Sequence, residues 1–212
     1  MRLSGNIMAE QYKGTAIRVT EPLNYFAEPW KLDWYAKNGK AYCNKIGRAA
    51  MKIGSRVDEL IKGQVSNQLL TLDKKKDTIE VINCLKAWGK WQEVYQPKSI
   101  VPGTRLFATI EGVEVTGEPD IFVDDVLVDI KCSAKISLAY WIQVNMYKFL
   151  SSEQSMYGSK VVEGNVGILR LDKLTTSYEY VVKDYDARLV DVWIGMMRAM
   201  VYYKGEENGD VI

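Results

Sequence analysis

The chain has 212 residues, of which 47% are hydrophobic and 26% are charged. This balance is typical of a folded globular protein, and it excludes a disordered, collagen-like or membrane-spanning chain as a description of the whole. Its 28 basic residues stand against 27 acidic ones. The resulting net charge of +1 neither requires nor excludes a polyanionic partner, because a basic groove can lie on a neutral protein.

The residue types present limit the chemistry. The chain has no histidine, which excludes Ser-His-Asp and Cys-His catalysis and zinc sites of the HExxH type. An enzyme with this composition must use carboxylates, lysine, tyrosine or a hard metal ion held by oxygen atoms. The three cysteines, Cys43, Cys84 and Cys132, are far apart and form no CxxC pair. We therefore expect reduced thiols in a cytoplasmic, intracellular protein.

No apolar run reaches the roughly 18 residues that a membrane-spanning helix needs, and the first residues lack the apolar segment of a secretory signal. We therefore expect no contact with a membrane.

The first part of the chain predicts helices. Two short helices are expected after Thr20, broken by Pro29 and ended by Gly39. Over residues 41–61, apolar side chains recur at every third or fourth position, which predicts a helix with one buried face. A further helix is expected to begin near Asp77, with that residue in a capping position.

The middle of the chain has a different period. Short runs rich in β-branched residues extend from Ile100 to Lys131, separated by the turn-like pairs Glu111-Gly112 and Asp124-Asp125. They predict an antiparallel meander. A helix follows from about Ser137 to Leu150, then strands in GILRL and YEYVV, and a last helix from about Asp186 to Tyr203.

This order predicts an α/β fold with a mixed central β-sheet flanked by helices, in a single domain that spans residues 1–212. Within it we distinguish a helical part over about 20–95, a part with the meander and a helix over about 98–150, and C-terminal strands and a helix over about 165–204.

The run VLVDIK concentrates charge on one face of a strand. Alternation places Leu127, Asp129 and Lys131 together. The preceding segment GEPD is joined to this strand through the tight turn at Asp124-Asp125, so a hairpin can bring Asp120 close to Asp129. Two adjacent carboxylates repel each other, and a divalent cation between them would remove that cost. A surface hairpin with scattered charges remains the alternative interpretation.

Together, GEPD, DIK and Gln143-x-x-x-Tyr147 resemble the PD-(D/E)XK nuclease superfamily, and more narrowly its RecB-like exonuclease branch. That branch also has a G-x-x-x-H motif on an upstream helix. The matching stretch here runs from Gly54 to Glu59, with Asp58 at the histidine position. The resemblance covers roughly residues 41–150 and implies a restriction-endonuclease-like core. The four cysteines of related iron–sulfur nucleases are missing.

The resemblance implies a metal-dependent deoxyribonuclease, most simply an exonuclease that acts in DNA repair, recombination or phage DNA processing. It implies that Lys131 orients the attacking water or stabilises the transition state, and that Gln143 and Tyr147 position the DNA strand. One or two Mg²⁺ or Mn²⁺ ions would be held by Asp58, Asp120, Asp129 and the backbone carbonyl of Ile130, with Glu59 in reserve.

Helical geometry favours Asp58 over Glu59. At ~100° per residue, Asp58 lies ~100° from the centre of the buried stripe at Val57, whereas Glu59 lies ~200° away, toward solvent. An ordinary surface acid remains the alternative for Asp58. The same geometry groups Tyr140 with Gln143 and Tyr147 on one flank of their helix, but we expect Tyr140 to be only part of a polar edge.

Lys135, Arg105 and Arg170 are further candidates for contact with DNA phosphates. Two other functions remain open: a non-catalytic nucleic-acid-binding protein on the same fold, and a structure-selective endonuclease. The intact Asp/Asp/Lys set argues against the first. DNA is the expected partner, and a homo-oligomer or a separate recombination or replication protein is compatible with the sequence. A bacterial or phage origin is also compatible with it.

Overall fold

The computed structural model describes residues 16–26, 29–68, 71–73, 75, 77–153 and 164–207. Five strands form one sheet in the order β2-β5-β6-β7-β8: β2 (Ile100–Pro102), β5 (Ile121–Val123), β6 (Val126–Lys131), β7 (Asn165–Leu171) and β8 (Tyr178–Asp184). Three strands form a second sheet in the order β1-β4-β3: β1 (Ile17–Arg18), β3 (Leu106–Ile110) and β4 (Val113–Gly117).

The larger sheet is mixed, since β6 and β7 run parallel and its other pairs are antiparallel. The predicted α/β class with a mixed sheet is confirmed. The single predicted meander is wrong, because the β3–β4 and β5–β6 hairpins belong to different sheets. The chain passes from one sheet to the other at Pro119, which has no N–H to continue a strand ladder. Next to it, the N–H of Gly103 donates to the carbonyl of Asp120 at 2.9 Å.

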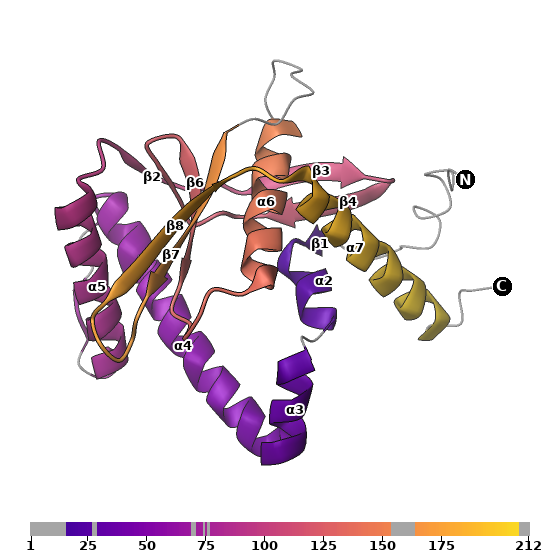
Figure 1. Ribbon diagram of the computed structural model, residues 1–212, viewed down its shortest axis with the longest axis horizontal. Helices are drawn as coiled ribbons and strands as arrows, with labels where there is room; N and C mark the ends of the chain where they lie inside the picture. Colours follow the sequence, from indigo (N-terminus) through magenta and orange to yellow (C-terminus); the bar gives the residue numbers. More distant parts are fainter. Residues whose placement is uncertain are drawn as a thin grey trace.

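The helices are arranged around these sheets: α2 (Thr20–Tyr25), α3 (Pro29–Asn38), α4 (Lys40–Val65), α5 (Ile79–Tyr95), α6 (Leu138–Glu153) and α7 (Ala187–Glu207). α4 and α5 cover one face of the larger sheet, while α6 lies between the two sheets and packs against α7 (Figure 1). The predicted pair of short helices is confirmed. They end at Gly39, whose φ of +80° suits glycine.

Each face of the larger sheet is covered by a hydrophobic core. Leu127 and Ile168 point toward α6 and α7, where they join Trp193. Val128 and Leu169, their neighbours along β6 and β7, point toward α4 and α5. Alternation along a strand produces this division, and it places Asp129 opposite Val128, as predicted, on the face that α6 covers.

Two details of the helical part differ from expectation. Val57, Leu60 and Ile61 in the C-terminal half of α4 are buried, but Tyr42 and Ile46 in its N-terminal half are exposed. That half extends with α3 away from both sheets, so the predicted stripe has no sheet to cover there (Figure 1). Asp77 does not cap α5, which begins at Ile79. Its carboxylate instead accepts a hydrogen bond from Arg56 at 2.6 Å.

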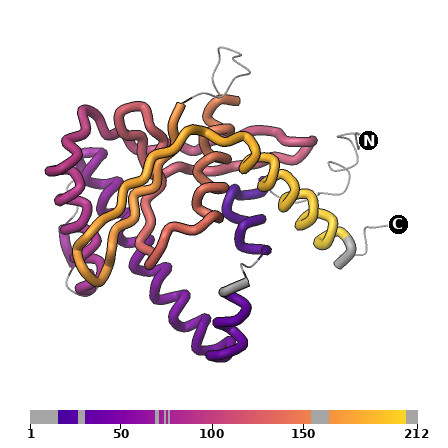
Figure 2. Tube along the Cα trace, in the orientation of Figure 1, coloured from indigo at the N-terminus to yellow at the C-terminus, as the bar shows by residue number. Residues whose placement is uncertain are grey.

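The N-terminal and C-terminal helices lie against each other, as the indigo and yellow segments of Figure 2 show for α2 and α7. The indole N–H of Trp193 donates to the carbonyl of Val19 at 2.7 Å, and Lys204 pairs with Glu21 at 2.5 Å. Among the described residues, no helix combines the length and apolar character that crossing a bilayer would need.

Candidate active site

One cavity of about 280 Å³ gathers six of the residues singled out from the sequence. It lies where the mid-part of α4, the β5–β6 hairpin and α6 meet, and its walls include Asp58, Asp120, Asp129, Ile130, Lys131 and Gln143. These residues come from segments up to 85 positions apart in the chain, so only the tertiary fold brings them together.

The β5–β6 hairpin positions two of the acids. Ile121 pairs with Val128, so the preceding Asp120 lies opposite Asp129. The backbone N–H of Ile130 donates to Oδ2 of Asp120 at 2.7 Å, which holds this carboxylate against the end of β6. The predicted proximity of the two acids is therefore confirmed.

Asp129 is buried, with 1% of its surface exposed. Its Oδ2 lies 2.6 Å from Nζ of Lys131, and its Oδ1 accepts a hydrogen bond from Nε2 of Gln143 at 3.3 Å. Burial raises the pKa of Asp129 to about 7, although the ammonium of Lys131 opposes the shift. Gln143 of α6 covers this carboxylate.

For the ammonium of Lys131, the neighbouring charges together affect the pKa more than burial does. Burial by itself lowers the pKa of its ammonium, but the adjacent Asp129 and then Asp120 raise it more, so the group stays protonated. It is thus a permanent positive charge at the wall of the cavity.

α4 contributes Asp58, one turn after Gly54. Its Oδ2 lies 3.3 Å from Nζ of Lys62, while its Oδ1 is buried and has no hydrogen-bond partner among the described residues. Burial and the nearby Asp120 raise the pKa of Asp58 to about 6. Glu59 lies outside the cavity, with a side chain that is 58% exposed and paired with Arg56 at 3.0 Å. The helix orientation predicted from the sequence is confirmed.

Sequence reasoning missed Lys62. Its Nζ lies 3.3 Å from Oδ2 of Asp58, 3.4 Å from Oε1 of Glu118 and 3.8 Å from Oδ1 of Asp120. The available signal was its i, i+4 spacing from Asp58, which puts both side chains on one face of α4. Two ammonium groups therefore lie beside the carboxylates, that of Lys62 near Asp58 and Asp120 and that of Lys131 near Asp129.

Gln143 and Tyr147 form a chain behind Asp129. Nε2 of Gln143 also donates to the hydroxyl of Tyr147 at 2.9 Å, and both residues are buried. The tyrosine ring lies so close to Gly117 that a Cβ there would be 2.5 Å from Cε1. These contacts orient the Asp129 carboxylate, and they leave little of either side chain for the DNA contact that the resemblance implies.

The candidate phosphate-binding residues lie outside the cavity. Arg105 is exposed and 3.7 Å from Glu118. Arg170 on β7 is the strand-register partner of Lys131 on β6. Its guanidinium, however, is held by Glu179 at 2.9 Å and by Asp172 at 3.4 Å.

Lys135 and Tyr140 lie in a neighbouring cavity. The ammonium of Lys131 is 5.0 Å from the centroid of the Tyr140 ring. Tyr140 was expected to be only part of a polar edge of its helix, and the structure adds that its ring lies beside Lys131.

The cavity that contains Asp58, Asp120 and Asp129 offers the donor atoms that a hard metal ion needs. Carboxylates and a backbone carbonyl are oxygen donors, which suit Mg²⁺ or Mn²⁺, and Oδ1 of Asp58 is a buried oxygen without a partner. In the described ranges, no three Asp, Glu, Cys or His side chains already form a metal cluster. The cations beside the acids are Lys62 and Lys131. The donor chemistry fits a hard divalent ion, which would compete with Lys62 for the same oxygens.

No protein-family model matches the chain, and no curated protein sequence matches it. Among solved structures, it is similar to a Eubacterium rectale protein whose assignment as an exonuclease is provisional. The identity is 14% and the TM-score 0.58, over 99% of this chain and 86% of that one.

Two further similarities have a TM-score of 0.43. One is to a phage-related exonuclease from Haemophilus somnus 129PT, at 16% identity over 96% of this chain and 99% of that one. The other is to an alkaline exonuclease from Laribacter hongkongensis, at 13% identity over 93% and 95%. The Eubacterium rectale similarity shows a shared fold. This chain therefore has the mixed α/β fold of that protein.

Proposed function

We propose that this protein is a metal-dependent DNA nuclease of the PD-(D/E)XK type, from the RecB-like branch, and that it acts as an exonuclease. The observation that supports this proposal most directly is that one cavity contains Asp58, Asp120, Asp129 and Lys131. These residues lie on or next to the helix and strands that the sequence resemblance implies. Gathering three acids and two ammonium groups is costly in a purely structural role, because buried charges lose their hydration.

The residues have distinct parts in phosphodiester hydrolysis. Asp58, Asp120, Asp129 and the carbonyl of Ile130 would hold Mg²⁺ or Mn²⁺, which supplies Lewis acidity and lowers the pKa of bound water. Lys131, held 2.6 Å from Asp129, orients the water and neutralises charge that develops on the phosphate. Gln143 and Tyr147 hold Asp129 in position. Such an activity would serve DNA repair, recombination or phage DNA processing.

The test compares end-labelled linear DNA with closed-circular DNA in the presence of Mg²⁺ or Mn²⁺. We expect the wild type to degrade the linear form alone. Asp129→Asn and Lys131→Met should lower the rate by about 10²–10³, as loss of one transition-state contact does in other enzymes. Asp58→Asn should also be inactive, whereas Glu59→Gln, a change of the adjacent acid on the same helix, should retain activity.

Each alternative gives a different result. Cleavage of the closed circle would identify a structure-selective endonuclease. Binding of DNA without hydrolysis under either metal would identify a non-catalytic binding protein. An inactive Glu59→Gln beside a normal Asp58→Asn would show that the ligand on α4 is assigned wrongly.

A further inference from the structure

A second cavity, of about 820 Å³, lies next to the candidate active site. It is formed by the end of α2, the start of α3, the loop before α6, the first turn of α6 and one face of α7. We call it the α2–α6 groove. The residues used below are Phe26, Lys31, Lys135, Leu138 and Tyr140.

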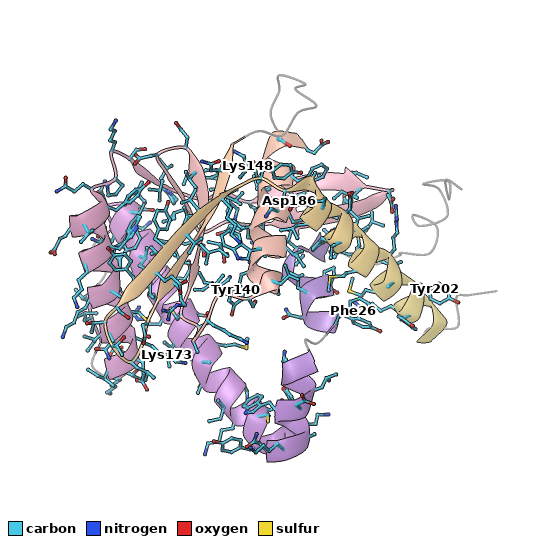
Figure 3. The ribbon with its side chains drawn as sticks, in the orientation of Figure 1. Phe26, Tyr140, Lys148, Lys173, Asp186 and Tyr202 are labelled. Carbon is cyan, nitrogen blue, oxygen red and sulfur yellow. The ribbon has the colours of Figure 1, made fainter. Side chains whose placement is uncertain are left out.

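The lining of the α2–α6 groove combines positive charge with rings. Lys31 and Lys135 contribute two ammonium groups, and no Asp or Glu is among the described residues that line it. Phe26 and Tyr140 are partly buried against the core, so packing holds each ring while part of it stays accessible. Figure 3 shows them at the ends of α2 and α6 that face α3. Leu138, on the same turn as Tyr140, is 63% exposed.

Tyr140 joins the groove to the candidate active site. Its ring is part of the groove wall, and the ammonium of Lys131 lies 5.0 Å from the ring centroid. A nucleic-acid strand whose phosphate lies at Lys131 would therefore have its adjacent nucleotides at Tyr140.

We infer that the α2–α6 groove binds the single DNA strand next to the phosphate being cut, with bases stacked on Tyr140 and Phe26 and phosphates near Lys31 and Lys135. Accessible rings beside lysines are the chemistry by which proteins hold single strands, because every base has a face to stack. Paired bases in a duplex hide those faces. This inference rests on the proposed function and extends it to the substrate strand.

The test measures binding of a labelled oligothymidylate by fluorescence anisotropy, with Ca²⁺ in place of Mg²⁺ to prevent cleavage. Phe26→Ala should weaken binding about tenfold, within the range measured for loss of one stacked base. Lys31→Gln should reduce the slope of log K against log salt by about 0.7, the value for one phosphate contact on a single strand. Tyr42→Ala and Lys37→Gln are matched controls outside the groove, and we expect wild-type binding from both.

The outcomes separate this inference from the proposed function. If Phe26→Ala and Lys31→Gln keep the wild-type affinity and salt slope, the proposal that the groove binds single-stranded DNA is wrong, even if the protein degrades DNA. Weakening of duplex binding alone would also overturn it. If the groove variants lose single-strand binding while the wild type never hydrolyses DNA, single-strand binding by the groove is supported and the nuclease proposal is wrong. Should Phe26→Ala not fold, the salt slope of Lys31→Gln decides.

Discussion

Lys62 lies where carboxylates from α4 and from the loop between β4 and β5 approach one another. Its ammonium is within 3.3–3.8 Å of oxygen atoms on Asp58, Glu118 and Asp120. Without a positive charge there, these acids would repel one another, so the ammonium stabilises the metal-free protein. The same position makes it a competitor of any cation that binds Asp58 and Asp120.

We therefore expect Lys62→Met to have two opposite effects. The metal-free melting temperature should fall by a few degrees, because a partly exposed ion pair is worth about 1 kcal/mol or less and each kcal/mol shifts a domain of this size by about 2–4 °C. The affinity for Mg²⁺ should rise about tenfold, a typical size for coupling between two ligands.

Thermal melts across a Mg²⁺ titration at constant ionic strength measure both effects. Lys52→Met, an exposed position on α4, removes the same charge and is the control. If Lys62→Met and the wild type share one titration midpoint, the ammonium does not occupy the cation position.

The raised pKa values of Asp58 and Asp129 predict how stability depends on pH in the metal-free protein. Burial raises the pKa of Asp129 to about 7 and that of Asp58 to about 6, above the value of about 3.9 in an unfolded chain. Between about pH 4 and 7 the folded state therefore binds protons that the unfolded state has lost. Stability falls as pH rises through this window, and the loss is complete above it.

Asp129→Asn isolates this effect. In EDTA, urea denaturation should show the wild type losing stability relative to the variant between pH 5 and pH 8, on the order of a few kcal/mol. Other groups titrate in both proteins, so the measured quantity is the difference between the two. A difference that stays constant with pH would show that the carboxyl of Asp129 titrates normally.

At the scale of the elements, the junction between β2 and β5 positions Asp120. Gly103 follows β2, and a Cβ built on it would lie 2.0 Å from the carbonyl oxygen of Pro119. That oxygen belongs to the backbone, so a side chain at residue 103 must displace the segment that carries Asp120. Glycine is needed here for the close approach of two backbones.

Gly103→Ala should consequently destabilise the protein by about 1–3 kcal/mol and weaken Mg²⁺ binding through the shift of Asp120. Gly195→Ala is the matched control, because nothing lies within 4 Å of a Cβ at that position in α7. It should be neutral or stabilise by up to about 1 kcal/mol, since alanine favours helix. Melting curves and Mg²⁺ titrations of both variants measure this. A Gly103→Ala protein with wild-type values would contradict it.

For the whole molecule, the larger sheet couples the two hydrophobic cores. Leu127 on β6 and Leu169 on β7 are both fully buried, one in the core under α6 and α7, the other under α4 and α5. Because β6 and β7 pair along their length, neither core can open without disturbing the strands that carry the other.

We expect one cooperative thermal transition, and we expect Leu127→Ala and Leu169→Ala each to lower its midpoint. Each change removes a fully buried side chain, which costs about 2–5 kcal/mol. Differential scanning calorimetry distinguishes the cases. If one variant splits the transition into two, the faces of the sheet unfold separately.

The sequence by itself determined most of the local structure. Period-2 alternation placed Asp129 on the face of β6 opposite Val128, and the Asp124-Asp125 turn brought Asp120 beside it, because both relations involve neighbours in the chain. Helical geometry separated Asp58 from Glu59 for the same reason. Lys62, four residues from Asp58, was within reach of this reasoning and was overlooked.

Only the tertiary structure decided relations between distant segments. It buried Asp129 beneath Gln143 of α6, placed Tyr140 beside Lys131, and left Tyr42 exposed where α4 extends past the sheet. It also divided the strands into two sheets at Gly103 and Pro119. Periodicity reports which face of an element is apolar, but the partner of that face, and the water it excludes, depend on how elements pack. The raised pKa values of Asp58 and Asp129 follow from that packing.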